Sequence, residues 1–504
     1  MRGARGLLSA SKTTAAVATL LLAACGANTG SSVGSPATSS LRIGVGQVAA
    51  ASSPGQGLRQ LVQNLTVESL ATLTDEGRPR PSLAKDWIVS PDGLSLTVNL
   101  APNLTFHDGS PLTATVVANA LQAMLPNMMG AAFEDVDGVK AVSDQQVVVR
   151  FRRPSPFLLD ALETPIPKPG SSLVGTGPFA VVDPKSPTEL TANDHYALGR
   201  PGVDRVVLQT FPSVRAAWAE LLRGRLDMLY EVGIDALDSL ETSTSVSMFT
   251  HTRHYQYIVV LNTQSDVFRS KEVRRALNFA VDRDLLVRDA LNGHGVASSG
   301  PVWPQNYGFR PELPKFELDA RGAATTFSRG NPTGNQAGSF RFTCLIPPDS
   351  VNERLALVLK RQLEAVGVNM SVEAAPMDRV YNALKNRQFE AALIEGISGP
   401  TLLRPYQLWH SKGAFNAGGL GNATVDAAFD RVRHAATDKE YEQAVAGVQR
   451  AFMDDPPGIF LAWSVVARAV NKRFTVPAPE PGRDIVATLR LWKQMTEAPR
   501  SSQH

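Results

Sequence analysis

The segment Phe340-Arg-Phe-Thr-Cys-Leu-Ile346 opens the most regular part of the chain and decides the fold class. It has the pattern of a strand, and Ser350-Val-Asn-Glu353 then has the capping-box spacing that begins an amphipathic helix. Residues 368–374 alternate apolar and polar as a second strand, Asp378 is placed to cap another helix, and residues 389–394 form a third strand. Strands that alternate with helices predict a parallel sheet covered by helices, which is an α/β fold.

Further strands and helices are predicted on both sides of this segment. Strands are expected at residues 41–45, 94–100, 146–151, 179–182, 203–209, 227–230 and 246–261. Helices are expected from Thr113 to a stop at Pro126, from Ser213 to Leu222, from Asp282 to Gly293, and from Asp438 to the prolines at 456–457. Residues 322–340 form one long predicted loop, which is either a surface excursion or a lid.

Length and composition indicate a large folded protein. The chain has 504 residues, which at roughly 150 residues per folding unit predicts about three units or two large lobes. Hydrophobic residues make up 43% and charged residues 19%, so the chain has enough apolar material for real cores. Two cysteines, Cys25 and Cys344, are too few for a disulfide framework or a cysteine zinc site.

The charge balance argues against a nucleic-acid ligand. Three of the 50 Lys and Arg residues, and none of the 47 Asp and Glu residues, lie in residues 1–24. Without that segment the chain carries equal numbers of basic and acidic residues. A neutral protein lacks the basic surface that binds a phosphate backbone.

The N-terminus has the pattern of an export signal. A basic start is followed by an apolar stretch, residues 15–24, which is shorter than the roughly 20 residues of a membrane-spanning helix. Leu22-Ala-Ala-Cys25 resembles the lipobox of bacterial lipoproteins, in which the cysteine is lipidated after cleavage; the alternative is an ordinary secretory signal with a chance cysteine. Residues 25–40 are rich in Gly, Ser, Ala and Thr and predict a flexible tether. The prediction is a protein anchored by lipid to the outer face of the cell membrane, and no later segment is long and apolar enough to span it.

A search for catalytic and metal motifs finds none that predicts an enzyme. Gly44-Val-Gly46 lacks the third glycine and the following helix of a phosphate-binding loop. His251 and His254 fall in a predicted strand, where residues three apart point to opposite faces, so they are expected to be surface or turn histidines rather than metal ligands. Cys344 alternates with Phe342 and Ile346 and is expected to be a buried small hydrophobe.

Five blocks, all in order between about residues 41 and 491, resemble the solute-binding proteins of the oligopeptide, dipeptide and nickel ABC importers (family 5). The blocks are Pro81-Ser-Leu-Ala-Lys-Asp-Trp87 with Ser90-Pro-Asp-Gly93, then Phe106-His-Asp-Gly-Ser-Pro-Leu-Thr-Ala114, Gly175-Thr-Gly-Pro-Phe179, Leu261-Asn-Thr263 with Val273-Arg-Arg-Ala-Leu-Asn-Phe-Ala-Val-Asp-Arg283, and the strand-helix-strand stretch that ends at residues 389–394. Their chemistry is largely structural: Gly175 and Gly177 are expected to permit a tight turn, and His107 to be a structural histidine. The resemblance therefore identifies a fold, and function follows by analogy.

The resemblance implies a two-lobed periplasmic-binding-protein-like fold (type II, class C) with an extra subdomain in lobe I. The implied division is a signal peptide at 1–24, a tether at 25–40, lobe I at 41–255 with an inserted subdomain at about 61–174, lobe II at 256–464, a C-terminal return to lobe I at 465–495, and a tail at 496–504. Two hinge strands are expected to cross between the lobes near residues 254–259 and 463–469.

By the same resemblance the chain is a non-enzymatic, lipid-anchored receptor that encloses a solute between its lobes and delivers it to permease and ATPase subunits of an importer. It is expected to be a monomer with no cofactor and no bound metal. The predicted lipidation site is Cys25. The predicted cleft residues are Gln47, Val48, Tyr255, Tyr257, Trp303, Glu395, Gly396, Ile397, Ser398, Arg404, Tyr406 and Trp409. Arg404 is a candidate partner of a ligand carboxylate, or a surface residue.

One departure from the family pattern leaves the ligand open. Peptide-binding relatives anchor the peptide α-amino group with an aspartate just beyond a lobe II strand, and here residues 389–394 are followed by Glu395, with Asp426 the next aspartate. Glu395 either substitutes for it or is a solvated strand-end residue. Blocked or modified peptides, sugars, a metal chelate and haem stay open as ligands. The alternative function is a regulatory or scaffolding envelope lipoprotein that reuses the fold.

Overall fold

A computed structural model describes residues 38–46, 56–328, 340–479 and 481–495. The predicted signal peptide, Cys25, most of the tether, Gln47, Val48 and the tail lie outside the described residues. Within the described part of the chain, no helix has the length and apolar character needed to cross a membrane.

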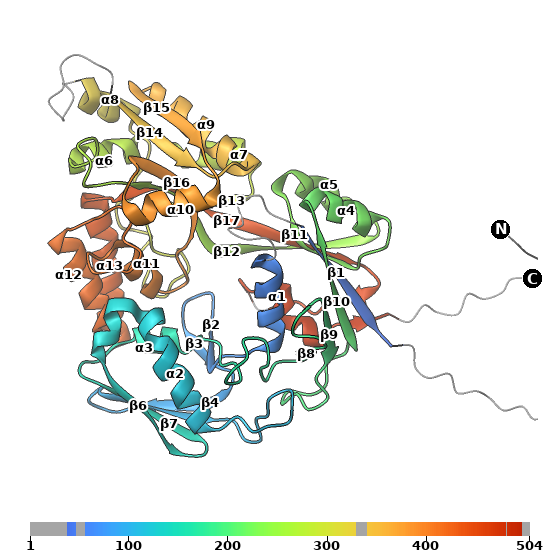
Figure 1. The fold of residues 1–504 in the computed structure, drawn as a ribbon. Coiled ribbons are helices and arrows are strands. Elements are labelled where there is room, and N and C mark those ends of the chain that lie inside the picture. The colour runs from blue at the N-terminus through green and yellow to red at the C-terminus, as the bar shows by residue number, and fades with distance from the viewer. Residues whose placement is uncertain (1–37, 47–55, 329–339, 480, 496–504) are drawn as a thin grey trace, which may run out of the picture. The chain divides into compact units, whose positions relative to one another are not determined.

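A sheet of eleven strands carries most of the described fold (Figure 1). Its strands are β1 (Ser40–Gly46), β8 (Phe179–Val181), β9 (Glu189–Ala192), β10 (Arg205–Phe211), β11 (Met228–Val232), β12 (Val246–Leu261), β13 (Gly295–Ala297), β14 (Phe340–Ile346), β15 (Val368–Ala374), β16 (Ala391–Ile397) and β17 (Gly458–Asn471). Their order is β15-β14-β16-β12-β17-β11-β1-β10-β9-β8, with β13 also paired to β17. The strands expected from the sequence that belong to this sheet are present, with bounds within three residues of those predicted.

Three smaller sheets, thirteen α-helices and three 3-10 helices complete the described residues. The strands are β2 (Ala71–Leu73) with β3 (Pro79–Pro81), β18 (Phe474–Thr475) with β19 (Lys493–Gln494), and a four-stranded sheet β4-β5-β7-β6 made of β4 (Ala84–Val89), β5 (Ser95–Leu100), β6 (Val136–Ser143) and β7 (Gln146–Phe151). The helices are α1 (Gln56–Thr66), α2 (Ala114–Met129), α3 (Phe157–Ala161), α4 (Val214–Leu222), α5 (Leu237–Glu241), α6 (Lys271–Phe279), α7 (Arg283–Ala290), α8 (Ala320–Ser328), α9 (Ser350–Glu364), α10 (Met377–Asn386), α11 (Leu403–Trp409), α12 (Ala423–Arg433) and α13 (Asp438–Asp454), with η1 (Gly130–Asp135), η2 (Ile234–Ala236) and η3 (Ile485–Leu491).

The predicted alternation of strands and helices around β14 is confirmed. β14 pairs in parallel with β15 and with β16, and α9 and α10 connect the three strands. The predicted caps are wrong by one or two residues. Helix α9 is capped by Asp349, because its carboxylate accepts the amides of Val351 and Asn352, and α10 begins at Met377 after Pro376.

Two other sequence predictions need correction. Helix α2 does not stop at Pro126 but continues to Met129, and the carbonyl of Pro126 still accepts the amide of Gly130 at the end of the helix. The predicted loop at 322–340 begins as helix: α8 extends to Ser328, and residues 329–339 lie outside the described residues.

Two long antiparallel strands, β12 and β17, run side by side through the middle of the large sheet (Figure 1). β12 also pairs with β16 on its other edge, and β17 pairs with β11, so each long strand joins a different half of the sheet. The register of the β12–β17 ladder shifts twice, first between the pairs Thr252–Val465 and Gln256–Trp463 and again between Tyr257–Ala462 and Ile258–Phe460. Residues 253–255 of β12 therefore lie at an irregular crossing point.

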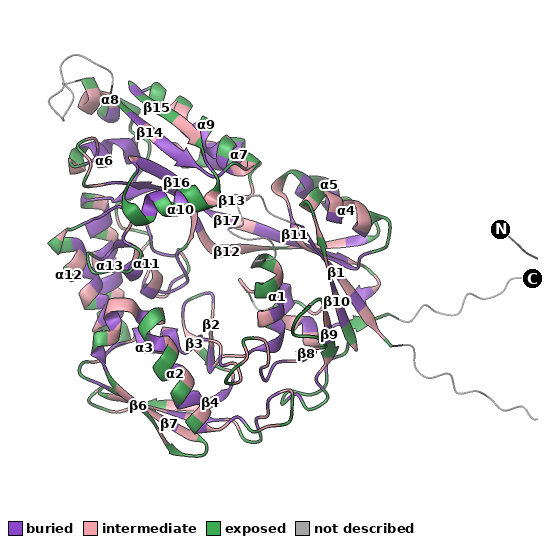
Figure 2. Ribbon diagram, in the orientation of Figure 1, coloured by how far each residue is buried: buried purple, intermediate pink, exposed green. Residues whose placement is uncertain are grey.

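The four-stranded sheet shares a hydrophobic core with helices α11–α13. The buried cluster is continuous from the inner faces of β5 and β7 through α2 and α3 to these helices, as the purple interior in Figure 2 indicates. The rings of Phe157 and Tyr406 meet edge to face at 5.5 Å. Arg433 Nε and Asp135 Oδ2 form an ion pair at 2.5 Å, with 2% and 1% of the two side chains exposed. The segment that holds β4–β7 therefore packs firmly on the C-terminal helices.

The Val273–Arg283 block fastens helix α6 and the start of α7 to β17. Arg283 is buried without a carboxylate partner among the described residues, and its guanidinium donates to the carbonyls of Asn278, Val281, Ser298, Phe316 and Phe460. Burial lowers its pKa to about 9. Asn278 donates to the carbonyl of Gly458 at 2.9 Å. These bonds fix the point at which β17 enters the sheet.

The Gly175-Thr-Gly177 block permits close packing rather than the predicted tight turn. Neither glycine has a positive φ. A Cβ on Gly175 would lie 2.2 Å from the carbonyl oxygen of Thr66, and one on Gly177 would lie 2.7 Å from the carbonyl carbon of the same residue. His107 lies against this block, with Nε2 3.1 Å from the carbonyl oxygen of Gly177, and is structural as predicted. The glycines are required because two backbone segments touch there.

Replacing Gly175 with alanine is expected to destabilise the protein by roughly 1–3 kcal/mol, because the methyl group overlaps the Thr66 backbone. Gly138→Ala is the matched control, since a Cβ at Gly138 in β6 meets nothing within 4 Å. The measurement is chemical unfolding of both variants beside the parent. Equal midpoints for the two variants would contradict the packing argument.

Candidate functional site

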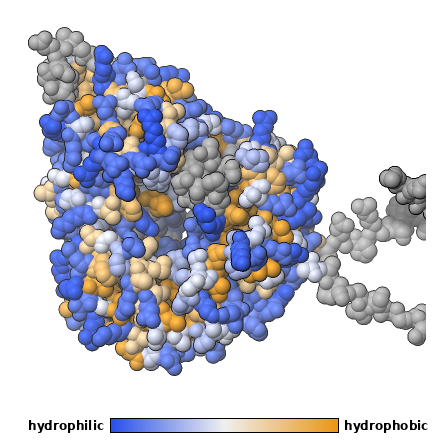
Figure 3. Space-filling view, in the orientation of Figure 1, coloured by the Kyte–Doolittle hydropathy of each residue, from blue (hydrophilic) through white to orange (hydrophobic). Residues whose placement is uncertain are grey.

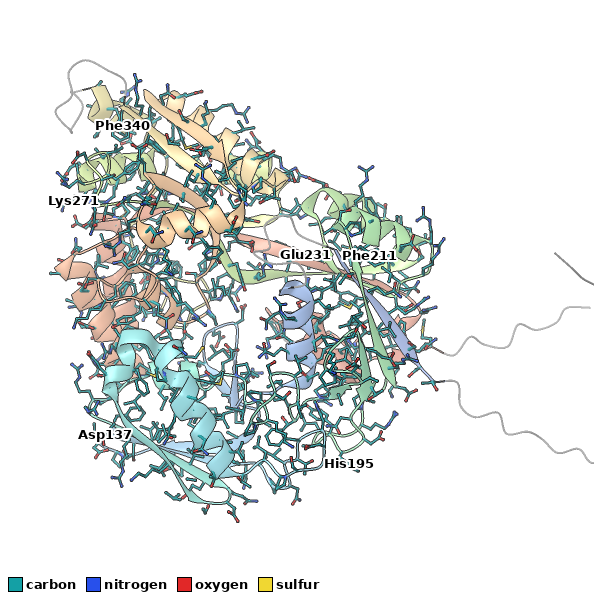
Figure 4. The ribbon with its side chains drawn as sticks, viewed as in Figure 1. Asp137, His195, Phe211, Glu231, Lys271 and Phe340 are labelled. Carbon is teal, nitrogen blue, oxygen red and sulfur yellow. The ribbon has the colours of Figure 1, made fainter. Side chains whose placement is uncertain are left out.

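The irregular crossing of β12 carries an ion pair and an aromatic ring on one face. The β12–β16 register places Tyr255, Tyr257, Glu395 and Ile397 on one face, and Arg253 contacts Tyr255 and Glu395; we call this the crossing face. Arg253 Nη2 lies 2.5 Å from Glu395 Oε1, and the guanidinium carbon is 4.5 Å from the centre of the Tyr255 ring. Burial alone lowers the pKa of Arg253, but the charges of Glu395 and of Glu231 on β11 (Figure 4) outweigh it and raise the pKa.

The opposite face of the crossing is packed against the β2–β3 hairpin. His254 Nε2 lies 3.0 Å from Asp75 Oδ1, and Trp303 Nε1 donates to the Asp75 carbonyl at 2.8 Å. The Trp303 ring meets His254 and Trp463 edge to face at 4.9 and 4.8 Å. Ser398 is fully buried, and its amide donates to the His254 carbonyl. This face is a rigid support for the residues on the other side.

A second ion pair lies where β17 meets β11. Arg468 Nη2 and Asp484 Oδ2 are 2.7 Å apart, and the guanidinium carbon lies 4.0 Å from the centre of the Tyr230 ring. Burial lowers the pKa of His251 to about 4, although the charge of Asp484 acts to raise it. Each half of the sheet therefore carries an ion-paired arginine that lies over a tyrosine ring: Arg253 over Tyr255, and Arg468 over Tyr230.

The acidic side chain of Glu163 follows helix α3. It is exposed, and desolvation by the protein around it raises its pKa. The charges of Arg483, His254 and Arg404 act on the Glu163 carboxylate and lower its pKa, which partly offsets the desolvation. Figure 3 shows that the molecule is hollowed at the centre of this face, in the region that α11, β12 and the β2–β3 hairpin border in Figure 1.

One edge of β16 is free at the end nearest the crossing. β14 pairs with β16 only at Ala391 and Ala392, whereas β12 pairs with β16 as far as Ile397. Residues 393–397 therefore have no strand partner on the β14 side within the described residues. A Cβ built on Gly396 would meet one atom within 4 Å, Ile394 Cδ1 at 3.8 Å, so there is space above this residue on one face of the sheet.

The structure brings together some of the predicted cleft residues and separates others. Tyr255, Glu395, Gly396, Ile397 and Arg404 gather around the free end of β16, with Trp303 and Ser398 buried beneath them. Tyr257 is the register partner of Glu395, but it is 7% exposed and packs in the core formed with β14–β16. Tyr406 and Trp409 are core residues, 0% and 2% exposed, under α12 and α13.

Four residues of this region were missed by the sequence analysis, namely Arg253, Asp75, Glu163 and Glu231. Arg253 had a signal, because it adjoins the predicted hinge at 254–259. The sequence contained no signal for Asp75 or Glu163, since the residues with which they interact are distant in the chain.

The structure places the two histidines differently from the sequence prediction and the cysteine as predicted. His251 and His254 lie on strand β12, half-buried, and are not the surface or turn residues expected. Within the described ranges no group of three His, Cys, Asp or Glu residues is arranged to hold a metal ion. Cys344 is buried as predicted, and burial raises its pKa to about 12.

Comparison with known proteins identifies relatives along nearly the whole chain. The model of the bacterial extracellular solute-binding proteins, family 5 (middle region), matches residues 78–418. The oligopeptide-binding protein AppA of Bacillus subtilis (strain 168) is 24% identical over 472 residues, covering 86% of this chain and 87% of AppA. The heme-binding protein A of Haemophilus influenzae is 25% identical over 383 residues, covering 68% of this chain and 69% of that protein.

A solved structure confirms the predicted fold class. NikZ from Campylobacter jejuni in complex with Ni(L-His) superposes with a TM-score of 0.76 at 21% identity, covering 90% of this chain and 99% of NikZ. The described residues thus have the two-lobed α/β fold of periplasmic binding proteins.

Stability is expected to depend on pH through Asp160 on α3. Burial raises the pKa of Asp160 to about 8, and the charge of Glu163 adds to this rise. A hydrogen bond from Thr401 acts in the opposite direction and lowers the pKa. The folded state therefore holds this proton more tightly than the unfolded chain. The stabilisation is complete below about pH 4 and is lost as the pH rises through about 8.

The measurement is the melting temperature from pH 5 to pH 9. Asp160→Asn is expected to lose less stability over this range than the parent, because it has no proton to release. Asp137→Asn is the control, since Asp137 on β6 is exposed and paired with Arg152 at 3.3 Å (Figure 4). Parallel curves for the parent and Asp160→Asn would show that Asp160 is not the responsible group.

Proposed function

The chain belongs to family 5 of the bacterial extracellular solute-binding proteins, and from that premise we propose that it captures a peptide or peptide-like solute between two lobes and delivers it to the permease of an ABC importer. In this proposal lobe I comprises residues 41–255, with a subdomain at about 61–174, and lobe II comprises 256–464. Residues 465–495 return to lobe I. The β12 and β17 strands act as the hinge, and the ladder interruption at 253–255 is the point where they flex.

The free edge of β16 carries the argument for a peptide. An extended peptide that adds to a sheet edge is held by main-chain hydrogen bonds, which are the same for every side chain. Residues 393–397 offer such an edge, because no strand pairs with them on the β14 side within the described residues. The relatives named above bind oligopeptides, heme or a nickel–histidine complex; among these, the edge favours the oligopeptide.

The side chains around the edge fit an adaptable site. Ile397 is 44% exposed at the end of β16, and Tyr255 lies beside it on the paired strand. Tyr381 on α10 is also exposed, at 59%. Apolar and aromatic walls with a few charged groups are typical of sites that bind small solutes.

A regulatory or scaffolding envelope lipoprotein is the second candidate function. The observation in its favour is that no aspartate stands directly after β16, where the family has one, and that the carboxylate of Glu395 is already paired with Arg253. A protein of this kind would bind no peptide in the cleft.

Membrane attachment through Cys25 is part of the proposal and rests on the sequence. The Leu22-Ala-Ala-Cys25 block precedes a Gly- and Ser-rich stretch that would place the folded part beyond the membrane surface. A single lipid chain gives only weak attachment, so the modified cysteine of a lipoprotein carries more than one chain.

Peptide binding is expected to raise the melting temperature of the purified full chain by about 3 °C at a peptide concentration of roughly 100 times the dissociation constant. The probe is a pool of synthetic pentapeptides with free termini. Ile397→Ala is expected to weaken binding roughly 5- to 30-fold through lost apolar contact. Ile88→Ala is the matched control, because Ile88 is a 63% exposed strand residue of the four-stranded sheet.

The two candidate functions give different results. A shift that Ile397→Ala reduces and Ile88→Ala retains supports the importer receptor. No shift with any peptide pool rejects peptide capture, and the second candidate then predicts that a protein partner binds the chain.

Cys25→Ser is expected to move the protein from the membrane fraction to the soluble extracytoplasmic fraction of a bacterial host, because the thioether needs a thiol. The measurement is fractionation together with metabolic labelling by a palmitate analogue. Cys344→Ala is the control, since Cys344 is buried inside β14 and out of reach of a lipid transferase. Retention and labelling of Cys25→Ser would reject the anchor.

A further inference from the structure

Ser39, near the start of the described residues, lies beside the segment that ends them. Ser39 Oγ is 3.5 Å from the carbonyl oxygen of Gly202. On the same glycine, a Cβ would lie 2.4 Å from the carbonyl oxygen of Trp492 and 3.3 Å from Lys493 Cγ. The chain therefore enters the fold, from the side of Cys25, next to residues 492–493.

Three apolar side chains around this point are exposed. Leu198 is 64% exposed, Leu491 43% and Met495 53%. The carbonyl of Leu198 accepts a hydrogen bond from Arg490 Nη1 at 3.4 Å, so the loop at Leu198 and the C-terminal segment are neighbours. Lys493, between the other two apolar residues, is exposed as well. We call Leu198, Leu491, Lys493 and Met495 the exit face.

The exit face is held by fixed structure. Trp492 is fully buried between two exposed neighbours, and its Nε1 donates to Thr488 Oγ1 at 3.0 Å. The amide of Met495 donates to the carbonyl of Arg473 at 2.8 Å, beside the β18–β19 pair. Because neighbouring side chains of an extended segment point in opposite directions, the inward Trp492 turns the residues on either side of it outward.

The charges beside the exit face nearly cancel. Lys493 has no ion pair among the described residues. Arg200, two residues beyond Leu198, pairs with both Asp194 and Asp204 at 2.7 Å, which leaves one negative charge there. Apolar contact is therefore what this face offers to a partner.

The predicted tether determines what lies opposite the exit face. Under the proposed anchor at Cys25, residues 26–37 join the lipid to Thr38, and a chain of their composition has a root-mean-square span of roughly 20 Å. A folded chain of this length has a radius of gyration of roughly 23 Å, so the body is wider than the tether is long. The face beside the tether is thus the one held against the lipid, at an effective concentration that is roughly millimolar.

Strand β1 separates the exit face from the crossing face. Ser40 begins β1 next to the exit face, and Gly46 ends it beside Phe211. Figure 4 shows Phe211 and Glu231 at this same end, and the charge of Glu231 acts on Arg253 of the crossing face. A strand of seven residues spans roughly 20 Å. The two faces therefore lie at opposite ends of β1.

We propose that the exit face rests on the outer surface of the lipid bilayer and turns the crossing face toward the solution. The inference rests on the proposed function, because it needs the anchor at Cys25. Contact of a few apolar side chains with a bilayer is weak for a free protein, and the tether makes it effective by keeping the face close. Docking leaves the cleft open to incoming solute, and the tether lets the body lift to meet a permease.

The test attaches the full chain to lipid vesicles through its own Cys25 thiol. The vesicles are phosphatidylcholine with a maleimide-bearing lipid for coupling and a lipid that carries a photoactivatable diazirine near its headgroup; Cys344 is buried and does not compete. After illumination, mass spectrometry locates the peptides that lipid has modified. We expect the peptides with Leu198 and Leu491 to be modified about 10-fold more than the peptide with Ile88, a 63% exposed residue of the four-stranded sheet.

The double variant Leu198→Gln/Leu491→Gln is expected to lower this modification about 10-fold, because it removes two apolar side chains from the contact. Ile88→Gln is the matched control and should leave it unchanged. Lys493→Gln should change it by less than about 5-fold, since one lysine contributes little at a neutral lipid surface. The melting temperature of each variant shows that it is folded, and Met495→Gln keeps the test decisive if the double variant does not fold.

The outcomes separate this inference from the proposed function. Equal modification of the Leu198 and Ile88 peptides would show that the body tumbles freely on its tether, and would overturn the docking. Modification of the exit face that the double variant keeps in full would overturn the apolar contact. No modification of either peptide overturns lipid docking and leaves the exit face to a protein partner. Chemical coupling does not depend on lipidation in the cell, so none of these results bears on the anchor or on peptide capture.

Discussion

The antiparallel ladder between β12 and β17 is the constraint on which both halves of the structure depend. The strands have 16 and 14 residues, and they pair from Val246 with Asn471 to Val260 with Gly458. One half of the sheet is attached through β16 to β12, and the other through β11 to β17. A slip of one residue in this register would turn Arg253 and Tyr255 to the opposite face of the sheet and would dismantle the site.

The sequence blocks that identify the family serve this ladder and its surroundings rather than a ligand. Arg283 and Asn278 fix the entry of β17 by hydrogen bonds to backbone carbonyls, and Gly175 lets two segments of backbone touch. None of these roles involves a solute. The blocks therefore report the fold reliably and carry no information about what the protein binds, and the residues around Tyr255, outside the blocks, are where binding can differ between relatives.

The parts of the fold that could be predicted are those with a local pattern. The β14–β16 region was predicted because apolar periodicity is a property of neighbouring residues, while its caps were misplaced because Asp349, one residue earlier, competes with Ser350 for the same amides. Tyr255 and Glu395 were predicted as site residues from the fold. Their partners were not: Arg253 is 142 residues from Glu395, and Asp75 is 179 residues from His254. Contacts between segments so far apart in the chain produce no pattern of neighbouring residues from which they could be predicted.

The arrangement divides recognition between two kinds of contact. A backbone edge binds any extended chain alike, so it supplies affinity without selecting a sequence. The Arg253–Glu395 pair is internally neutral and costs desolvation, but it holds Tyr255 in place and removes Glu395 as a free acid. Under the proposed function, selection is left to the side chains beside the edge, such as Tyr255 and the exposed Ile397.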